Sequence, residues 1–274
     1  MSLCKANKAV SDEVKNFMLN VPDVKEESIT DYLVWKWREL DARFKFINVS
    51  TFTRHEESKT SGADFELELW LVGSRFHFPL IFQAKKFVRQ HGSYFNKLNY
   101  PAGTQAQLKM LLAYAKTKNR LPFYAFYSVP DAKTRSMCRG HDPSNTGIFM
   151  ADAYTIKTFA DGLHGKRISK NDLLKVSNPF HCMFCCPLVQ LGDYFTSYFS
   201  SLSNAAQPRE NEHLPEYVNM ILNEQRSEVS EQETLPIINK YGLRAFRAVG
   251  VYDMRNADEE LNQSFNQGVL KHAP

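Results

Sequence analysis

Three side chains that could bind a metal ion and act on a phosphate stand in one stretch that predicts a β-hairpin. The stretch 64–86, DFELELWLVGSRFHFPLIFQAKK, begins with Asp64 and ends with Gln83 and Lys85 close together. Residues two apart in a strand share a face, so Gln83 and Lys85 are expected to point the same way. Carboxylate, amide and backbone carbonyl oxygens are the hard ligands that Mg²⁺ prefers, and a neighbouring ammonium stabilises charge developing on a phosphate. The spacing therefore indicates phosphodiester chemistry.

Two further carboxylates are candidates to complete the metal site. Glu66 stands two residues after Asp64, on the same predicted strand face. Glu27 stands at the start of the first confident helix and could reach the site from another element. In the alternative interpretation the acids form a solvated strand face, and Lys85 and Lys86 are a cationic strand end.

The pattern around the hairpin predicts a mixed α/β (α+β) unit within a domain of residues 1–150. After a polar leader, apolar residues at helical spacing predict a helix in ESITDYLVWKWRELDARF, and FKFINVSTFTRHE predicts a strand. Beyond the hairpin, TQAQLKMLLAYAKTKN predicts a helix with Thr104 as N-cap, and LPFYAFYSV a strand. The predicted order is helix, three strands, helix, strand.

Residues 151–274 are expected to form a C-terminal extension, mixed at first and then helical, that could pack on the core as one domain. GIFMADAYTIKTFADG predicts a strand followed by a short helix. Further helices are expected at 193–203 and 213–225, with 203–213 as the best linker candidate and a frayed tail after Asn262. The extension would serve substrate selection, dimerisation or partner contacts.

This pattern resembles the PD-(D/E)XK nuclease superfamily. The residues that carry the resemblance are GAD before the hairpin, QAKK at its end, and a helical glutamate upstream in EESITD. The pattern is most similar to the branch typified by Mrr-type restriction endonucleases, in which glutamine replaces the acidic residue of the last motif. The resemblance covers roughly residues 26–129 and implies a restriction-endonuclease-like αβββαβ core.

The resemblance also implies an activity and its residues. The chain would be a metal-dependent endonuclease that hydrolyses phosphodiester bonds in nucleic acid, with DNA as the expected substrate and Mg²⁺ or Mn²⁺ as cofactor. Asp64, Gln83 and Glu27, with Glu66, would hold the metal, and Lys85 would be the catalytic lysine. By analogy, the setting would be restriction or antiphage defence. Because Gln83 is neutral, the alternative is a catalytically inactive nuclease-fold protein that binds nucleic acid or a protein partner.

Cations and aromatic side chains alternate after the hairpin. Lys86, Arg89 and Lys97 could contact phosphates, and Tyr100 could stack on a base. Gln105 or Gln107, in the helix predicted after the hairpin, falls where the nucleases that the chain resembles often place a polar residue facing the substrate. The alternative is an ordinary loop whose aromatic residues pack on the core.

Cysteines gather in the second half of the chain. Cys182 and Cys185 form a C-x-x-C pair next to His181, and with the distant Cys138 they would provide the four N/S ligands of a zinc site. A complete site would show a second close pair of ligands, and we find none in the sequence. Core packing of small hydrophobic cysteines is therefore the favoured interpretation.

Composition limits the remaining classes. The chain has 274 residues, 43% apolar and 23% charged, as is ordinary for a soluble globular protein. A net charge of +4 does not indicate a nucleic-acid binder by itself, although positive residues gather in 85–139. No apolar run could span a membrane, no signal peptide is recognisable, and five cysteines do not suggest a secreted disulfide framework. We expect a cytoplasmic protein without a membrane partner, with a homodimer or a defence-system protein as candidate partners.

Overall fold

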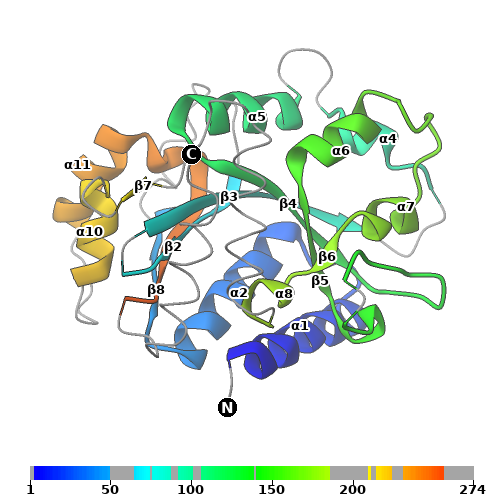
Figure 1. The fold of residues 1–274 in the computed structure, drawn as a ribbon, viewed down its shortest axis with the longest axis horizontal. Helices are drawn as coiled ribbons and strands as arrows, with labels where there is room; N and C mark the ends of the chain where they lie inside the picture. The colour runs from blue at the N-terminus through cyan, green and yellow to red at the C-terminus, as the bar shows by residue number, and fades with distance from the viewer. Residues whose placement is uncertain are drawn as a thin grey trace. The chain divides into compact units, whose positions relative to one another are not determined.

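The computed structural model describes residues 3–49, 65–74, 76–87, 92–100, 106–138, 140–185, 209–210, 214–223 and 231–255 (Figure 1). Its fold is mixed α/β, as the sequence predicts. The chain divides into two compact units, and neither is a continuous stretch. The first unit comprises Met1–Leu33, Phe82–Ala115 and Pro122–Cys186; the second comprises Val34–Ile81, Lys116–Leu121 and Pro187–Pro274.

The sheet of the first unit is built on strongly apolar strands. The second part of β3 (Phe76–Phe87) is followed in the sheet by β4 (Leu121–Ser128), β5 (Ile148–Asp152) and β6 (Asn178–Pro179). β5 pairs antiparallel with both β4 and β6. Every residue of β4 is buried, as expected for a strand covered on both faces. The predicted strand LPFYAFYSV is thereby confirmed.

A helix that the sequence analysis missed lies at the start of the first unit. The predicted polar leader forms α1 (Leu3–Asn20), because a narrow apolar stripe on an otherwise polar helix is buried. Ser11 and Gly147 fix this helix, since the Ser11 carbonyl accepts the Gly147 N–H at 2.8 Å. A Cβ on Gly147 would lie 2.4 Å from the backbone nitrogen of Lys15, so only glycine permits this approach.

The sequence predicts three further helices, and the structure contains them together with shorter ones. α2 (Glu26–Leu40) and α5 (Gln107–Lys118) are the two helices expected around the hairpin, and β5 followed by α6 (Ala153–Ala160) matches the expected strand and helix. Shorter helices are α4 (Phe95–Leu98), α7 (Lys170–Lys175) and α8 (Cys182–Cys185), and a 3-10 turn, η2, covers Pro143–Asn145. Within the first unit, α4 packs on α6, and α1 packs on α8 (Figure 1).

The sheet of the second unit contains a strand from far along the chain. Its order is β1 (Phe44–Asn48), β8 (Phe246–Asp253), β2 (Phe65–Val72) and the first part of β3. β8 is antiparallel to β1 and parallel to β2. Gly250 is needed at the centre, because a Cβ there would lie 2.1 Å from the ring of Phe46. β2 and β3 are neighbours in the sheet, so the predicted hairpin is present. β8 lies between β1 and β2.

Helices α10 (Glu216–Asn223) and α11 (Glu231–Tyr241) also belong to the second unit, with a short 3-10 turn, η4 (Leu243–Ala245). α10 packs on β8 and β1 and confirms the helix expected at 213–225. The two-residue β7 (Arg209–Glu210) pairs with β3 inside the predicted linker. The helix predicted at 193–203, the cap Thr104 and the tail after Asn262 lie outside the described residues.

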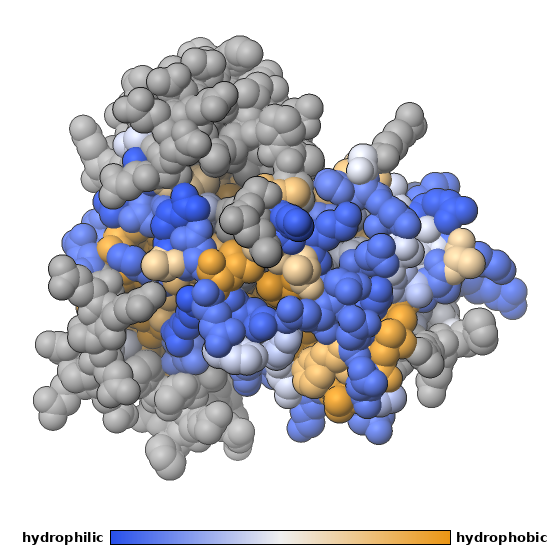
Figure 2. Space-filling view, turned by 90° about the horizontal axis from the view of Figure 1, so that it is seen from below, coloured by the Kyte–Doolittle hydropathy of each residue, from blue (hydrophilic) through white to orange (hydrophobic). Residues whose placement is uncertain are grey.

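The surface of the described chain is largely polar. Hydrophilic residues dominate the coloured area in Figure 2, with smaller hydrophobic areas between them. Among the described residues, the exposed large hydrophobic side chains are Val21, Trp35, Tyr100, Met137 and Leu163. Among the described helices, none combines the length and the apolar character needed to cross a bilayer.

Candidate functional site

The end of β3 and the start of α2 bring an acid and a base together in the first unit. Nζ of Lys85 lies 3.9 Å from Oε2 of Glu26, with side chains 12% and 29% exposed. Glu26 is the first residue of α2, where the helix dipole stabilises a negative charge. The pair is partly shielded from water, so the attraction between its charges is stronger than that of a fully exposed ion pair.

Lys86 fastens the segment before α2 to the end of β3. Its backbone N–H donates to Oε1 of Glu26 at 2.8 Å, and its ammonium donates to the carbonyl of Val24 at 2.6 Å and to that of Pro22. We expected this ammonium to contact phosphate, whereas in the structure it is occupied by backbone carbonyls. Lys86 therefore positions Glu26.

Gln83 lies two residues before Lys85 on the same face of β3, as predicted from strand alternation. Its side chain is 2% exposed, and its Oε1 has no hydrogen-bond partner among the described residues. Its Nε2 makes one long contact of 3.4 Å with the Ala84 carbonyl. A buried acceptor without a donor costs free energy in the empty protein, so this oxygen is well suited to a ligand.

Two tyrosines of β4, which the sequence analysis did not select, also reach this region. Oη of Tyr127 and Oγ1 of Thr30 are 2.8 Å apart, and this hydrogen bond holds the first turns of α2. Oη of Tyr124 is buried without a hydrogen-bond partner in the described part of the chain. Burial raises the pKa of Tyr124, and the negative charge of Glu26 raises it further. Tyr124 is therefore a neutral hydrogen-bond donor near Glu26.

The carboxylate that meets Lys85 is the neighbour of the one predicted. Glu27 lies half-buried in the first turn of α2 and forms no ion pair within the described residues, whereas Glu26 forms the contacts above. Asp64, the predicted principal metal ligand, lies outside the described residues. The roles of Glu27 and Asp64 stay predictions.

The predicted nucleic-acid contacts are partly placed. Tyr100 is 67% exposed, and Lys97 is exposed with its Nζ 5.5 Å from the ring centroid of Tyr94. Burial raises the pKa of Tyr94, which keeps that ring neutral. Arg89 and Gln105 lie outside the described residues.

Comparison with known proteins places the chain in a family. Residues 3–248 match the family of unknown function DUF6615. The chain belongs to DUF6615. No curated protein and no solved structure matches it.

The acids of β2 in this DUF6615 chain are buried in the second unit. Glu68 is fully buried, and its carboxylate accepts from Arg120 Nε at 2.6 Å and from Tyr217 Oη at 2.8 Å. Burial lowers the pKa of Arg120, but the charge of Glu68 outweighs this effect and the pKa is raised. The Arg120 guanidinium also lies 4.4 Å from the ring centroid of Trp70. The alternative interpretation, a solvated strand face, is thus wrong for Glu68, which is a buried, paired charge.

Glu66, the other candidate metal ligand on β2, is 5% exposed. It belongs to the second unit, whereas Gln83 and Lys85 belong to the first. Its participation in the same metal site stays a prediction.

The cysteine and histidine candidates of this DUF6615 chain form a cluster in the first unit. One ligand atom from each of Cys138, His141 and Cys182 lies within 4.8 Å of the others. His181 is buried next to Cys182, and its ring lies 5.0 Å from that of His141, centroid to centroid. Burial, with nearby positive groups, lowers the pKa of His181 to about 4. Cys185 is the last residue of α8, but its side chain lies outside the described part.

His141 supplies the second close pair of ligands, and the expectation that the chain has no such pair is therefore wrong. Cys138 and His141 form a C-x-x-H pair that the structure brings to the C-x-x-C segment. The spacing was visible in the sequence, but a cysteine paired with a histidine is a weaker signal than a second pair of cysteines.

Proposed function

We propose that this chain is a metal-dependent nuclease with its catalytic centre where α2 meets β3. The observation that carries the proposal is the ion pair between Glu26 of α2 and Lys85 of β3. The same strand carries Gln83, whose side-chain oxygen is buried. Apart from the short α4 between β3 and α5, the order α2, β1, β2, β3, α5, β4 is similar to the αβββαβ order of the PD-(D/E)XK superfamily and supports the proposal. β8 adds a strand between β1 and β2 to that order.

The residues at this place fit a hard divalent cation. The buried Oε1 of Gln83 lacks a donor in the described part, and the carboxylate of Glu26 and the carbonyl of Ala84 offer further oxygen ligands. Asp64 would be the principal ligand, as the resemblance implies. When bound, Mg²⁺ or Mn²⁺ would polarise the phosphate and lower the pKa of a bound water.

The side chains of the chain itself supply positioning and charge. Lys85 would place its ammonium near a phosphate oxygen, where charge builds up as the phosphodiester bond breaks. The ion pair with Glu26 holds this ammonium in place, and the hydrogen bond from the Lys86 backbone N–H holds the Glu26 carboxylate. Lys97 and Tyr100 would contact the nucleic acid through its phosphates and bases. DNA is the substrate that we propose, in restriction or antiphage defence.

A cleavage assay tests the proposal. Wild-type protein, Lys85→Ala and the control Lys116→Ala, which changes an exposed lysine of α5, are incubated with plasmid DNA and with single-stranded RNA in Mg²⁺, Mn²⁺ or EDTA. We expect wild type and control to cut in the presence of metal, and Lys85→Ala to be slower by about 10²-fold or more. Thermal unfolding of each variant verifies that it is folded.

The other outcomes identify the alternatives. Tight binding of nucleic acid without cleavage by wild type would indicate an inactive nuclease-fold protein. If wild type neither binds nor cleaves nucleic acid, the proposal is overturned. If Lys85→Ala still cleaves, Lys85 has no part in the mechanism.

A further inference from the structure

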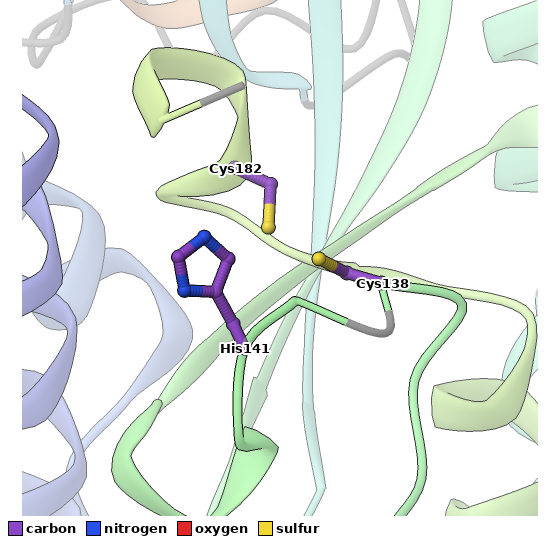
Figure 3. A group of neighbouring side chains, drawn as sticks. All are labelled: Cys138, His141 and Cys182. Atoms are coloured by element: carbon purple, nitrogen blue, oxygen red, sulfur yellow. The ribbon is translucent and has the colours of Figure 1, made fainter. Parts of the chain in front are cut away.

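Cys138, His141 and Cys182 converge from two segments that are distant along the chain. Cys138 and His141 lie in the loop between β4 and β5, and Cys182 begins α8. Figure 3 shows the two sulfur atoms facing the space between the segments, with the ring of His141 beside them. Among the described residues, the thiols of Cys138 and Cys182 are not part of a disulfide, whereas Cys4 is disulfide-bonded and so is not a ligand candidate.

The distances between these atoms are close to those of a metal site. Zinc binds sulfur at about 2.3 Å and imidazole nitrogen at about 2.0–2.1 Å, so tetrahedral ligand atoms lie roughly 3.3–3.8 Å apart. The three atoms already lie within 4.8 Å of one another without an ion, and small side-chain rotations would bring them to that spacing.

Core packing alone leaves part of this arrangement unexplained. Cys182 is buried, but Cys138 and His141 are only half-buried, so the cluster reaches the edge of the core. His181 beside it is 1% exposed, and neither of its ring nitrogens has a hydrogen-bond partner among the described residues. Two such buried ring nitrogens are costly unless something binds them.

We propose that Cys138, His141 and Cys182 bind a zinc-type ion that fastens the β4–β5 loop to α8. The pairs C-x-x-H and C-x-x-C have the short spacing that zinc sites use. The fourth ligand comes from beside Cys182: His181 is the buried candidate, and Cys185 is the candidate that the C-x-x-C spacing offers. With four protein ligands the site is closed, so its role is to stabilise the fold.

Metal analysis of the full chain is the first test. Protein purified without chelator should contain about one equivalent of zinc per chain, and Cys138→Ser, His141→Ala and Cys182→Ser should each contain much less. His164→Ala, which changes an exposed histidine elsewhere in the first unit, should keep the metal. Zinc well below one equivalent in wild type, before and after incubation with zinc salts, would overturn the proposal.

Cobalt substitution keeps the test decisive if a variant fails to fold. Wild-type protein loaded with Co²⁺ should show the visible absorption of a tetrahedral ion and a thiolate charge-transfer band in the near ultraviolet. A band that is unchanged in Cys185→Ser and altered in His181→Ala assigns the fourth position to His181, and the reverse assigns it to Cys185. A spectrum of octahedral, aquated Co²⁺ contradicts the site.

Stability gives an independent measurement. A chelator should lower the melting temperature of wild type and leave that of Cys182→Ser unchanged, because bound metal stabilises only the folded state. Lys85→Ala should keep its zinc. Failure of the proposed nuclease activity would therefore not affect this inference, and failure of the zinc site would not affect the nuclease.

Discussion

One carboxylate, that of Glu26, contacts two consecutive residues of β3. Oε1 accepts the backbone N–H of Lys86 at 2.8 Å across 60 residues of sequence, and Oε2 lies 3.9 Å from the ammonium of Lys85. The hydrogen bond fixes the orientation of the carboxylate, so the charge that Lys85 meets has a defined position. A fixed charge of this kind is what electrostatic catalysis requires.

Glu26→Gln and Glu27→Gln form a matched pair of variants, because they change adjacent glutamates of the same helical turn. Glu26→Gln should slow metal-dependent cleavage by about 10²-fold, since it removes the charge that faces Lys85. Glu27→Gln should remain within a few-fold of wild type. Single-turnover cleavage rates at saturating Mg²⁺ measure both, and the opposite ranking would restore Glu27 as the functional acid.

Tyr124→Phe separates function from stability. The buried hydroxyl has no partner within the described residues, so its removal should leave the free energy of unfolding unchanged or raise it by about 1–3 kcal/mol. If the hydroxyl donates to substrate or to a ligand-bound Glu26, cleavage should fall in the same variant. Urea unfolding and cleavage assays measure the two effects, and a clear loss of stability would mean that the hydroxyl has a partner in the folded protein.

Lys97 and Lys86 should differ in how they affect nucleic-acid binding. Lys97→Ala should weaken binding and reduce the salt dependence of the binding constant by about one unit of slope, because an exposed cation is lost. Lys86→Met should lower stability and leave the salt slope unchanged, since its ammonium is held by backbone carbonyls. Fluorescence anisotropy across a salt series gives the slopes; a reduced slope in Lys86→Met would show that this lysine reaches phosphate.

Glu68→Gln should destabilise the second unit strongly. The change leaves Arg120 buried without its counter-charge, which costs about 3–5 kcal/mol in comparable buried pairs. Tyr217→Phe removes two hydrogen bonds to charged groups, one donated to Glu68 and one accepted from Arg120, but leaves the ion pair in place; it should cost at least about 1.5–3 kcal/mol. Urea unfolding at neutral pH compares them, and a loss below about 1 kcal/mol in Glu68→Gln would contradict a buried ion pair.

Asp131 should contribute to stability at neutral pH but not in strong acid. Burial is the largest single influence on the pKa of Asp131 and raises it, but the hydrogen bonds from Lys170, Lys133 and Asn171 and the charge of Lys170 together outweigh burial and lower the pKa to about 2. Its stabilisation is therefore complete above the unfolded value near 3.8 and is lost as the pH falls toward 2. Asp131→Asn should unfold at lower urea than wild type at pH 7, and the difference should shrink below pH 4; a constant difference would exclude titration of Asp131 as its cause.

Local patterns in the sequence were sufficient for the elements around the site. The alternation of β3 places Gln83 and Lys85 on one face, and the apolar stripes of α2 and α5 predict both helices, because each signal depends only on near neighbours. α1 is polar on average, so its narrow apolar stripe gives a weak signal in the sequence. The stripe is recognisable as a buried face only from the tertiary structure, in which Gly147 packs against this helix.

Choices between neighbours required the tertiary structure. Successive residues of a helix point about 100° apart, so whether Glu26 or Glu27 faces β3 depends on how the helix docks. His141 lies 41 positions before Cys182, and no local periodicity connects them. The same limit applies to β8, whose pairing with β1 and β2 depends on chain closure over a long distance.

The position of β8 has a consequence for synthesis on the ribosome. β1 and β2 cannot acquire their shared neighbour until Phe246–Asp253 has left the exit tunnel, so the nascent second unit must wait with two strand edges unpaired. A premature stop codon shortly before Phe246 would leave β1 and β2 without their shared neighbour and so give an aggregation-prone product.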